Sequence, residues 1–523
     1  MPSIQIQVNA MRFINSVRRG VRLLLVLTVA ATLGSCTTLD VTNPNQPSSQ
    51  SFWQSSADAS RGLTAVYNSL ELLGVYGRWQ AFANDGRSDI ATARSSPWGD
   101  LANFNAFQLS DYNFEVNREL WIHNYMLIAR ANLVVANVPG IQMDPVIRSR
   151  MVGEAKFLRG LAYYNLVTLF ENVPLVTTVL LPDDRPATAT PVQTWAQIEL
   201  DFSEAAAVLP ATYGSADIGR ATKGAALGML GKARLQQRKW TDASAALGQV
   251  ISSGQYSLLA NYSDNFREST ELKNTESLFE AGMEDMYPIG VTGLSFPKMI
   301  GPCYRPGGGL PEYNPTYCDG RPTRWYFDEF QKSRTTTGDV DPRLDVTLMY
   351  NRADRANEMV YDRSRGSYFV NAPTGGQRAD TMIYFRKYGE WELPTDQRWD
   401  NPVNYRVLRY ADVLLMQAEA LNEQGQTALA FNFVNQVRRR ASKSDLVGLS
   451  TAQLRDSILY ERMFELGLES SRFNDLRRQN LLTPALASHD YDFTTFTTGK
   501  SERLPIPTTE RNLNPNVTQN PGW

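Results

Sequence analysis

Apolar residues recur at intervals of three and four along much of the chain, most clearly over 154–176. Two apolar lines run along this stretch: Ala155, Leu158, Ala162, Leu166 and Leu169, and Phe157, Leu161, Tyr164 and Val167. Because apolar positions then cover most of the circumference, the pattern predicts a buried helix. Asp144 and Pro145 form a favourable cap and first-turn pair upstream, and Pro174 ends the helix after Asn172.

Arg159 lies inside this apolar surface. A buried guanidinium needs a carboxylate or several carbonyl oxygens, because removing one partner of a buried ion pair costs about 3–5 kcal/mol. We therefore expect a structural ion pair at Arg159, and a ligand contact is the alternative.

Five further stretches with helical periodicity are predicted helices: 57–73, 115–138, 191–209, 409–424 and 451–470. Two windows, 224–257 and 411–444, also place residues at tetratricopeptide-like spacings. The matching positions are Leu227, Leu230, Gly231, Trp240, Ala243 and Leu247, and Leu414, Ala418, Leu421, Gly425, Ala430 and Val434. Small residues in such repeats let paired helices approach, and the pairs then stack. A mainly α fold of stacked helix hairpins is the prediction.

Two stretches lose this periodicity, 74–113 and 258–400. We interpret the first as a long loop region and the second as an irregular, loop-rich insertion on the helical scaffold. The insertion contains Cys303 and Cys318, which outside the cytoplasm are candidates for a disulfide that closes a loop.

Glu461, Glu465 and Glu469 form an acidic line at helical spacing, with Arg462 and Arg472 nearby. A solvated helix face or a structural salt-bridge network would each explain the line. We favour these two interpretations over a functional role.

The composition and the missing motifs limit the classes of function that the chain can have. The 523 residues are 42% hydrophobic and 20% charged, with a net charge of -2, so we expect no nucleic-acid partner. The chain has only two histidines, His123 and His489, and it lacks HExxH, CxxC and GxSxG motifs. We expect no metal, no cofactor and none of the commonest enzyme classes. A hydrolase that uses a pair of carboxylates stays open, since 54 Asp and Glu residues are available.

The N-terminus has the pattern of a lipoprotein signal peptide over 1–35. A basic region precedes the apolar stretch 21–33, which is too short to span a bilayer. Residues 33–36, LGSC, resemble a lipobox, so cleavage before Cys36 and acylation of its thiol are predicted. An ordinary signal peptide is the alternative. Residues 36–56 are rich in Thr, Asn, Pro, Gln and Ser and predict a tether.

Four stretches resemble signatures of one family, the RagB/SusD nutrient-binding lipoproteins. The buried helix matches the family pattern at Glu154, Ala155, Phe157, Leu158, Arg159, Tyr163, Leu166, Phe170, Val173, Pro174 and Leu175. Residues 408–420, 461–478 and the tail 504–523 resemble further motifs. The departures are Gly160 and Glu171 with Asn172 in the buried helix, and Asp412, 470–471 and Gln479 in the later motifs. The order of these motifs is specific, and the resemblance spans the whole mature chain.

The resemblance implies about four tetratricopeptide-like helix pairs in a superhelical scaffold that carries the irregular lobe. We accordingly divide the mature chain into an N-terminal helical region 57–257, the insertion 258–400 and a C-terminal region 401–523. The resemblance also implies a non-enzymatic lipoprotein of the outer membrane, exposed at the surface. Its partners would be an oligosaccharide or other nutrient and a SusC-like TonB-dependent transporter.

No ligand contact carries over from the family, because its binding loops vary. Sugars stack on flat aromatic rings and bond to amides, carboxylates and arginines, which gives eight candidates. These are Trp79, Asp85, Trp98 and Asn103 in the early loop, and Tyr304, Arg305, Trp325 and Tyr326 in the insertion. Packing of a large loop is the alternative at each position. A carboxylate-pair glycoside hydrolase and a protein-binding repeat scaffold are the alternative functions.

Overall fold

The computed structural model describes residues 52–93, 98–283, 294–301, 319–350, 383–389, 401–489 and 495–523, without the side chains of 272 and 273. The chain divides into two units, 1–54 and 55–523, and every helix and strand named below belongs to the second. The acylation of Cys36, the Cys303–Cys318 disulfide and the ligand roles of Tyr304 and Arg305 fall outside the described residues, so they stay predictions.

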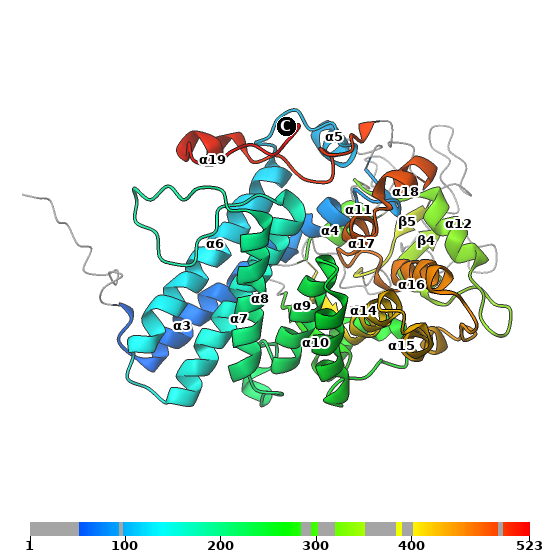
Figure 1. Ribbon diagram of the computed structural model, residues 1–523, viewed down its shortest axis with the longest axis horizontal. Helices are drawn as coiled ribbons and strands as arrows, with labels where there is room; N and C mark the ends of the chain where they lie inside the picture. The colour runs from blue at the N-terminus through cyan, green and yellow to red at the C-terminus, as the bar shows by residue number, and fades with distance from the viewer. Residues whose placement is uncertain are drawn as a thin grey trace, which may run out of the picture. The chain divides into compact units, whose positions relative to one another are not determined.

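Within the part of the chain that the structure describes, nine long helices build a scaffold of neighbouring pairs, which confirms the predicted mainly α, tetratricopeptide-like fold. The pairs are α3 (Ser56–Tyr67) with α6 (Glu115–Asn137), α7 (Pro145–Phe170) with α8 (Pro191–Val208), α9 (Lys223–Gln236) with α10 (Trp240–Ser252), and α14 (Tyr410–Glu423) with α15 (Thr427–Arg440). The ninth helix, α16 (Thr451–Leu466), packs against the last pair. Each pair also contacts the next, as the row from α3 to α15 in Figure 1 shows.

Local capping explains where the scaffold helices begin and end. The Asp144 carboxylate accepts hydrogen bonds from the backbone N–H groups of Val146 and Ile147, which opens α7 as predicted. At the other end Glu171 adopts a φ of 64°, which stops the helix before Pro174. The predicted helix 451–470 is too long, because α16 ends at Leu466 and the chain then turns through Leu468 and Ser470 at positive φ.

Glycines permit close approach at two places in the scaffold. A Cβ on Gly231 of α9 would lie 2.6 Å from the Leu247 side chain of α10, so this pair packs more closely than larger residues allow. A Cβ on Gly74 would lie 2.0 Å from the Glu119 carbonyl oxygen of α6. Gly425 takes a φ of 75° in the turn between α14 and α15, a conformation that glycine adopts readily.

Arg159 of α7 forms the predicted structural ion pair. Its Nε and one terminal nitrogen donate to the two Asp201 carboxylate oxygens of α8, at 2.9 and 2.7 Å. Its remaining nitrogen donates to the Asn132 side chain and to the Thr177 carbonyl. The guanidinium therefore joins three helices, α6, α7 and α8, and the segment that follows α7.

The loop-rich lobe holds short elements rather than long loops alone. Three two-stranded antiparallel pairs lie here: β1 (Ala91–Thr92) with β3 (Arg321–Pro322), β2 (Ser277–Ala281) with β6 (Tyr405–Arg409), and β4 (Leu348–Tyr350) with β5 (Ile383–Phe385). The short helices are α4 (Trp79–Asn84), α5 (Gly99–Asn105), α11 (Phe296–Ile300), α12 (Arg324–Lys332), α13 (Arg343–Thr347), α17 (Arg472–Arg478), α18 (Leu482–His489) and α19 (Thr508–Leu513). The 3-10 or π turns are η1 (Asn68–Glu71), η2 (Leu73–Gly77), η3 (Val138–Gly140), η4 (Ser215–Asp217), η5 (Tyr262–Phe266) and η6 (Glu268–Lys273). The predicted loop 74–113 thus contains α4 and α5.

The acidic line of α16 is a buried salt-bridge network, one of the two predicted interpretations. Glu465 is fully buried and pairs with Arg343 at 2.9 Å, with Arg409 at 3.0 Å and with Arg440. Burial alone would raise the pKa of the Glu465 carboxyl, but the three guanidinium groups hold it well below its ordinary value. Arg343 and Arg409 come from the lobe, whereas Glu465 belongs to the scaffold helix α16. The network therefore ties the lobe to the scaffold.

The tail 495–523 is held against the end of α7. The Asn520 side chain donates to the Phe170 carbonyl at 2.6 Å and to the Leu504 carbonyl at 2.7 Å. The Leu504 N–H in turn donates to the Leu169 carbonyl at 2.8 Å. Within the described residues, no helix has the length and apolar character needed to cross a bilayer.

Candidate functional site

The structure brings two of the predicted groups of residues into one part of the lobe. β1 lies within the early loop, between α4 and α5, and pairs with β3, which directly precedes α12. Thr323 strengthens this connection, because its N–H donates to the Ile90 carbonyl at 3.0 Å and its hydroxyl to the Asp89 carbonyl at 2.7 Å. The early loop and the segment that carries Trp325 are therefore joined by backbone hydrogen bonds.

Trp98 directly precedes α5, and Asn103 lies within this helix. Trp98 is half-buried, and its ring makes edge contacts with Phe114 at 5.2 Å and with Trp79 at 6.0 Å. Asn103 is exposed on the helix itself. An aromatic ring that contacts other rings, together with an exposed amide nearby in the sequence, is suited to binding a sugar.

Trp79 and Asp85 are fully buried and have partners inside the protein. The Trp79 indole donates to the Glu119 carboxylate at 2.7 Å. Asp85 accepts from the backbone N–H groups of Ser470 at 2.8 Å and Arg472 at 3.2 Å. Burial raises the pKa of Asp85 to about 7, although these two hydrogen bonds oppose the rise. Both positions fit the packing alternative better than a ligand contact.

Trp325 and Tyr326 are neighbours in α12 with different surroundings. Tyr326 is fully buried, and its hydroxyl donates to the Met463 carbonyl at 3.1 Å, which again fits packing. Trp325 is half-buried and stacks in parallel on the His489 imidazole, with ring centroids 3.6 Å apart. Tyr460 contacts the Trp325 ring edge-on at 6.2 Å. Trp325 thus belongs to an aromatic surface formed by α12, α16 and α18.

A buried ion pair fixes the base of this surface. Arg472 binds both carboxylate oxygens of Asp89, at 2.7 and 2.8 Å, and the His489 Nδ1 lies 3.1 Å from the same carboxylate. Burial opposes the ionisation of Asp89, yet Arg472 and then His489 lower the pKa of this carboxyl to about 2. The His489 imidazole, on which Trp325 stacks, is therefore held in position by the Asp89 carboxylate.

The sequence alone does not indicate that His489 and Tyr460 belong to this surface. His489 was weighed only as a possible metal ligand or catalytic base, and nothing local in 482–489 marks a stacking partner for Trp325. Among the residues that the structure describes, no group of three or more His, Cys, Asp and Glu side chains could hold a metal ion.

Stacked helix pairs define the class of the fold, a helical-repeat protein with a loop-rich lobe. Residues 275–523 match the model described as "SusD family", and residues 39–235 match one described as "Starch-binding associating with outer membrane". These two matches cover most of the sequence, and the chain belongs to the SusD/RagB family.

Relatives match over nearly the whole length. The SusD-like protein P25 of Formosa agariphila is 27% identical, over 89% of this chain and 91% of its own. The starch-binding protein SusD of Bacteroides thetaiotaomicron is 24% identical, over 76% of each chain. The solved structure of a laminarin-binding SusD-like protein is 28% identical with a TM-score of 0.73, over 90% of this chain and 100% of its own.

Proposed function

We propose that this chain is a surface-exposed outer-membrane lipoprotein that binds oligosaccharides and delivers them to a SusC-like TonB-dependent transporter. The observation that carries the proposal is the full-length similarity to a solved SusD-like protein that binds laminarin. The starch-binding relative and the family description that names the outer membrane support it further.

In this proposal the lobe binds the sugar without changing it. The C–H faces of pyranose rings would stack on Trp98 and Trp325, and the Asn103 amide would bond to hydroxyl groups. Trp98 is backed by Phe114, and Trp325 by His489, so both rings are held in place before the sugar arrives. Preorganised rings lose little conformational entropy on binding, which favours affinity.

Calorimetry of the purified protein with laminari- and malto-oligosaccharides tests the sugar site. Trp98→Ala and Trp325→Ala should each weaken binding about 5- to 150-fold, taking about 1–3 kcal/mol for one lost stacking contact as measured for nucleobases. The matched control is Trp240→Ala, a half-buried tryptophan at the start of α10, which should leave affinity unchanged.

Failure of all these oligosaccharides to bind would favour the protein-binding scaffold. Release of reducing ends from laminarin or starch would favour the glycoside hydrolase. Equal losses in Trp98→Ala and Trp240→Ala would show that the effect is not specific to the lobe.

Membrane anchoring through Cys36 is a separate part of the proposal. Cys36→Ala removes the thiol that would be acylated, so the protein should move from the membrane pellet to the soluble fraction. Immunoblotting of fractionated cells measures this. Normal processing and continued sedimentation of the variant with membranes would contradict lipid anchoring.

A further inference from the structure

Helix α6 carries a second apolar stripe that faces away from the scaffold. Its members are Ile122, Met126, Ala129 and Leu133, spaced by four, three and four residues. Ile122 and Met126 are 40% and 37% exposed, whereas Leu127 on the other side of the helix is buried. Large apolar side chains gathered on one exposed helix face usually mark an interaction surface.

The segment after α7 turns this stripe into one wall of a groove. The Tyr125 hydroxyl donates to the Pro174 carbonyl at 2.8 Å, and the Asn132 amide donates to the Val176 and Thr178 carbonyls at 3.1 and 3.0 Å. At the far end Asn514 donates to the Pro186 carbonyl at 2.8 Å. The segment is thus held to α6 at one end and to the tail at the other.

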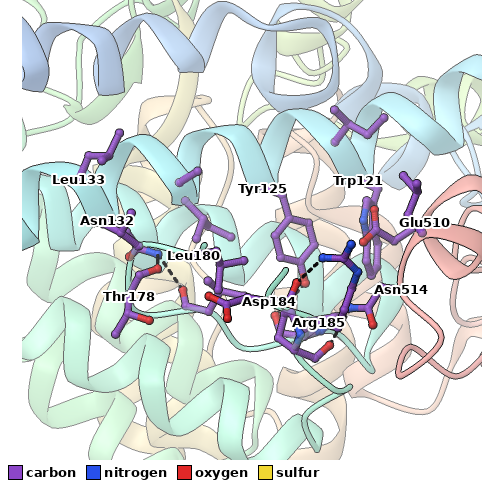
Figure 2. A pocket seen from close by; sticks show the side chains of 18 residues that line it. Trp121, Tyr125, Asn132, Leu133, Thr178, Leu180, Asp184, Arg185, Glu510 and Asn514 are labelled. Carbon is purple, nitrogen blue, oxygen red and sulfur yellow. Dashed lines mark hydrogen bonds between the residues drawn. The ribbon is translucent and has the colours of Figure 1, made fainter. Parts of the chain in front are cut away.

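Between these attachments the segment, α6 and α19 enclose a groove of about 560 Å³ (Figure 2). Its walls are mainly apolar, and Val179 and Leu180 of the segment are each 44% exposed. None of the six sugar-binding candidates that the structure describes lines it.

The polar side chains in the middle of the groove are already engaged. The Tyr125 hydroxyl and the Asn132 amide both donate to backbone carbonyls of the wall, as the dashed lines at Asn132 in Figure 2 show. A sugar presents hydroxyl groups all round and needs partners for them, since burying unpaired hydroxyls is costly. The groove therefore favours an apolar occupant and differs in chemistry from the tryptophan surface of the lobe.

The dimensions of the groove favour a row of side chains. The α6 residues that line it run from Trp121 to Leu133, which is about 18 Å at about 1.5 Å per residue. The side chains from one face of a helix of about three turns would fit.

The apolar surface extends beyond the groove onto its rims. Leu181 beside it is 69% exposed, and Leu513 of α19 is 71% exposed. A single acyl chain or a small molecule in the groove would leave these side chains in water. A protein segment with apolar flanks would cover them.

The charged side chains of the groove lie at the end nearest α19. Glu510 and Asp184 lie there with Arg185, whose guanidinium donates to the Pro182 and Asp184 carbonyls. Two carboxylates and one guanidinium leave a negative excess, which a cationic side chain would complement. Burial raises the pKa of Glu510, a carboxyl that a cation would stabilise in its charged form.

We propose that this groove is the docking site for an amphipathic helix of a protein partner, with apolar side chains along α6 and a lysine or arginine beside Glu510. The proposal goes beyond sugar binding and does not depend on it.

Photo-crosslinking in the native cell tests the docking site. A benzophenone amino acid is placed at Leu181 or Leu513 on the rims, and at the exposed Leu429 of α15 as the matched control. We expect the rim positions, and not Leu429, to label one segment of one protein, identified by mass spectrometry of the adduct. That segment should have apolar residues at helical spacing and a basic residue at the end that meets Glu510.

A synthetic peptide of the labelled segment then tests the chemistry on the purified protein. Fluorescence anisotropy should show that Leu180→Glu weakens peptide binding at least about tenfold, while Leu429→Glu does not. Glu510→Lys should weaken it as well, and a peptide with its basic residue reversed to glutamate should recover the affinity. Leu180→Glu should leave oligosaccharide binding unchanged, so failure of this proposal is distinguishable from failure of the sugar site.

Four outcomes would overturn the proposal. Adducts with lipid would assign the surface to the membrane, and adducts with a second copy of the chain would assign it to self-association. Labelling no stronger than at Leu429 would leave no partner at the groove. If neither Leu180→Glu nor Glu510→Lys changes the affinity for the synthetic peptide, the peptide binds at another site.

Discussion

Arg159 shows how a single side chain can join parts of the scaffold that are distant in sequence. Its guanidinium is 4% exposed and has five nitrogen–hydrogen donors, and it meets Asp201, Asn132 and the Thr177 carbonyl. A charge this deeply buried stabilises the fold only while its partners remain, because an unpaired carboxylate in the core is strongly disfavoured.

Arg159→Met should lower the free energy of unfolding by about 3–5 kcal/mol, since it leaves the Asp201 carboxylate buried without its main partner. Urea denaturation followed by circular dichroism measures the loss. The matched control is Arg159→Met combined with Asp201→Leu, which removes both charges and should recover most of the stability. An equal loss in the single and double variants would mean that packing, not charge, sets the cost.

Asp85 gives a pH dependence of known sign. Its pKa is raised by burial to about 7, against about 3.9 in an unfolded chain. A raised pKa in the folded state contributes most stability below the unfolded value, and the contribution declines as pH rises towards 7. Relative to Asp85→Asn, the wild-type protein should therefore lose up to about 4 kcal/mol of stability between pH 4 and pH 7, at about 1.4 kcal/mol per unit.

Asp89 provides the opposite case for comparison. Its lowered pKa of about 2 gives a stability contribution that is present above about pH 4 and is lost as the pH falls towards 2. Urea unfolding of Asp85→Asn and Asp89→Asn across this range should show differences from wild type with opposite slopes. A pH-independent difference for Asp85→Asn would contradict the raised pKa.

At the scale of elements, the approach of η2 to α6 depends on the absence of one side chain. Gly74→Ala would place a Cβ 2.0 Å from the Glu119 backbone oxygen, which cannot move without shifting the helix. The variant should therefore lose about 1–3 kcal/mol or more in thermal or urea unfolding. Gly248→Ala, inside α10 with nothing within 4 Å, should instead gain about 0.5–1 kcal/mol. The same sign for both variants would refute the close approach.

The scaffold elements could be predicted from the sequence because each is set by nearby residues. The cap at Asp144 and the helical spacing of 154–176 are local signals, and Gly231 and Gly425 mark the hairpins. The lobe could not be predicted in the same way. β1 and β3 have two residues each and join Ala91 to Pro322, so no local pattern is long enough to specify the pairing.

The residues of the candidate site also fall into two groups, those that the sequence could indicate and those that only the tertiary structure reveals. Trp98 and Trp325 could be selected because an aromatic residue in an irregular segment has few neighbours in sequence to pack against. Burial of Trp79 and Tyr326, and the stack of His489 on Trp325, depend on elements that meet only in the folded lobe. Their roles needed the tertiary structure.

At the scale of the whole molecule, the cluster around Glu465 connects the lobe to the scaffold. Arg343 of α13, Arg409 of β6 and Arg440 of α15 converge on this one carboxylate. The acidic line of α16 could be read from the sequence, but its partners could not, because they come from three separate segments. The network holds the lobe in one position, as a surface that presents rigid rings to a sugar requires.

The Asn520 contact has a consequence for the order in which the chain folds. Its side chain reaches the Phe170 carbonyl across a sequence separation of 350 residues, whereas α9 with α10, and α14 with α15, are joined by short turns. Contacts of large separation form slowly, because a long loop must first be closed. A chain that emerges with its N-terminus first therefore lacks the Asn520 contact at the end of α7 until residue 520 has been made. The first helix pairs can assemble early, and this attachment is added after them.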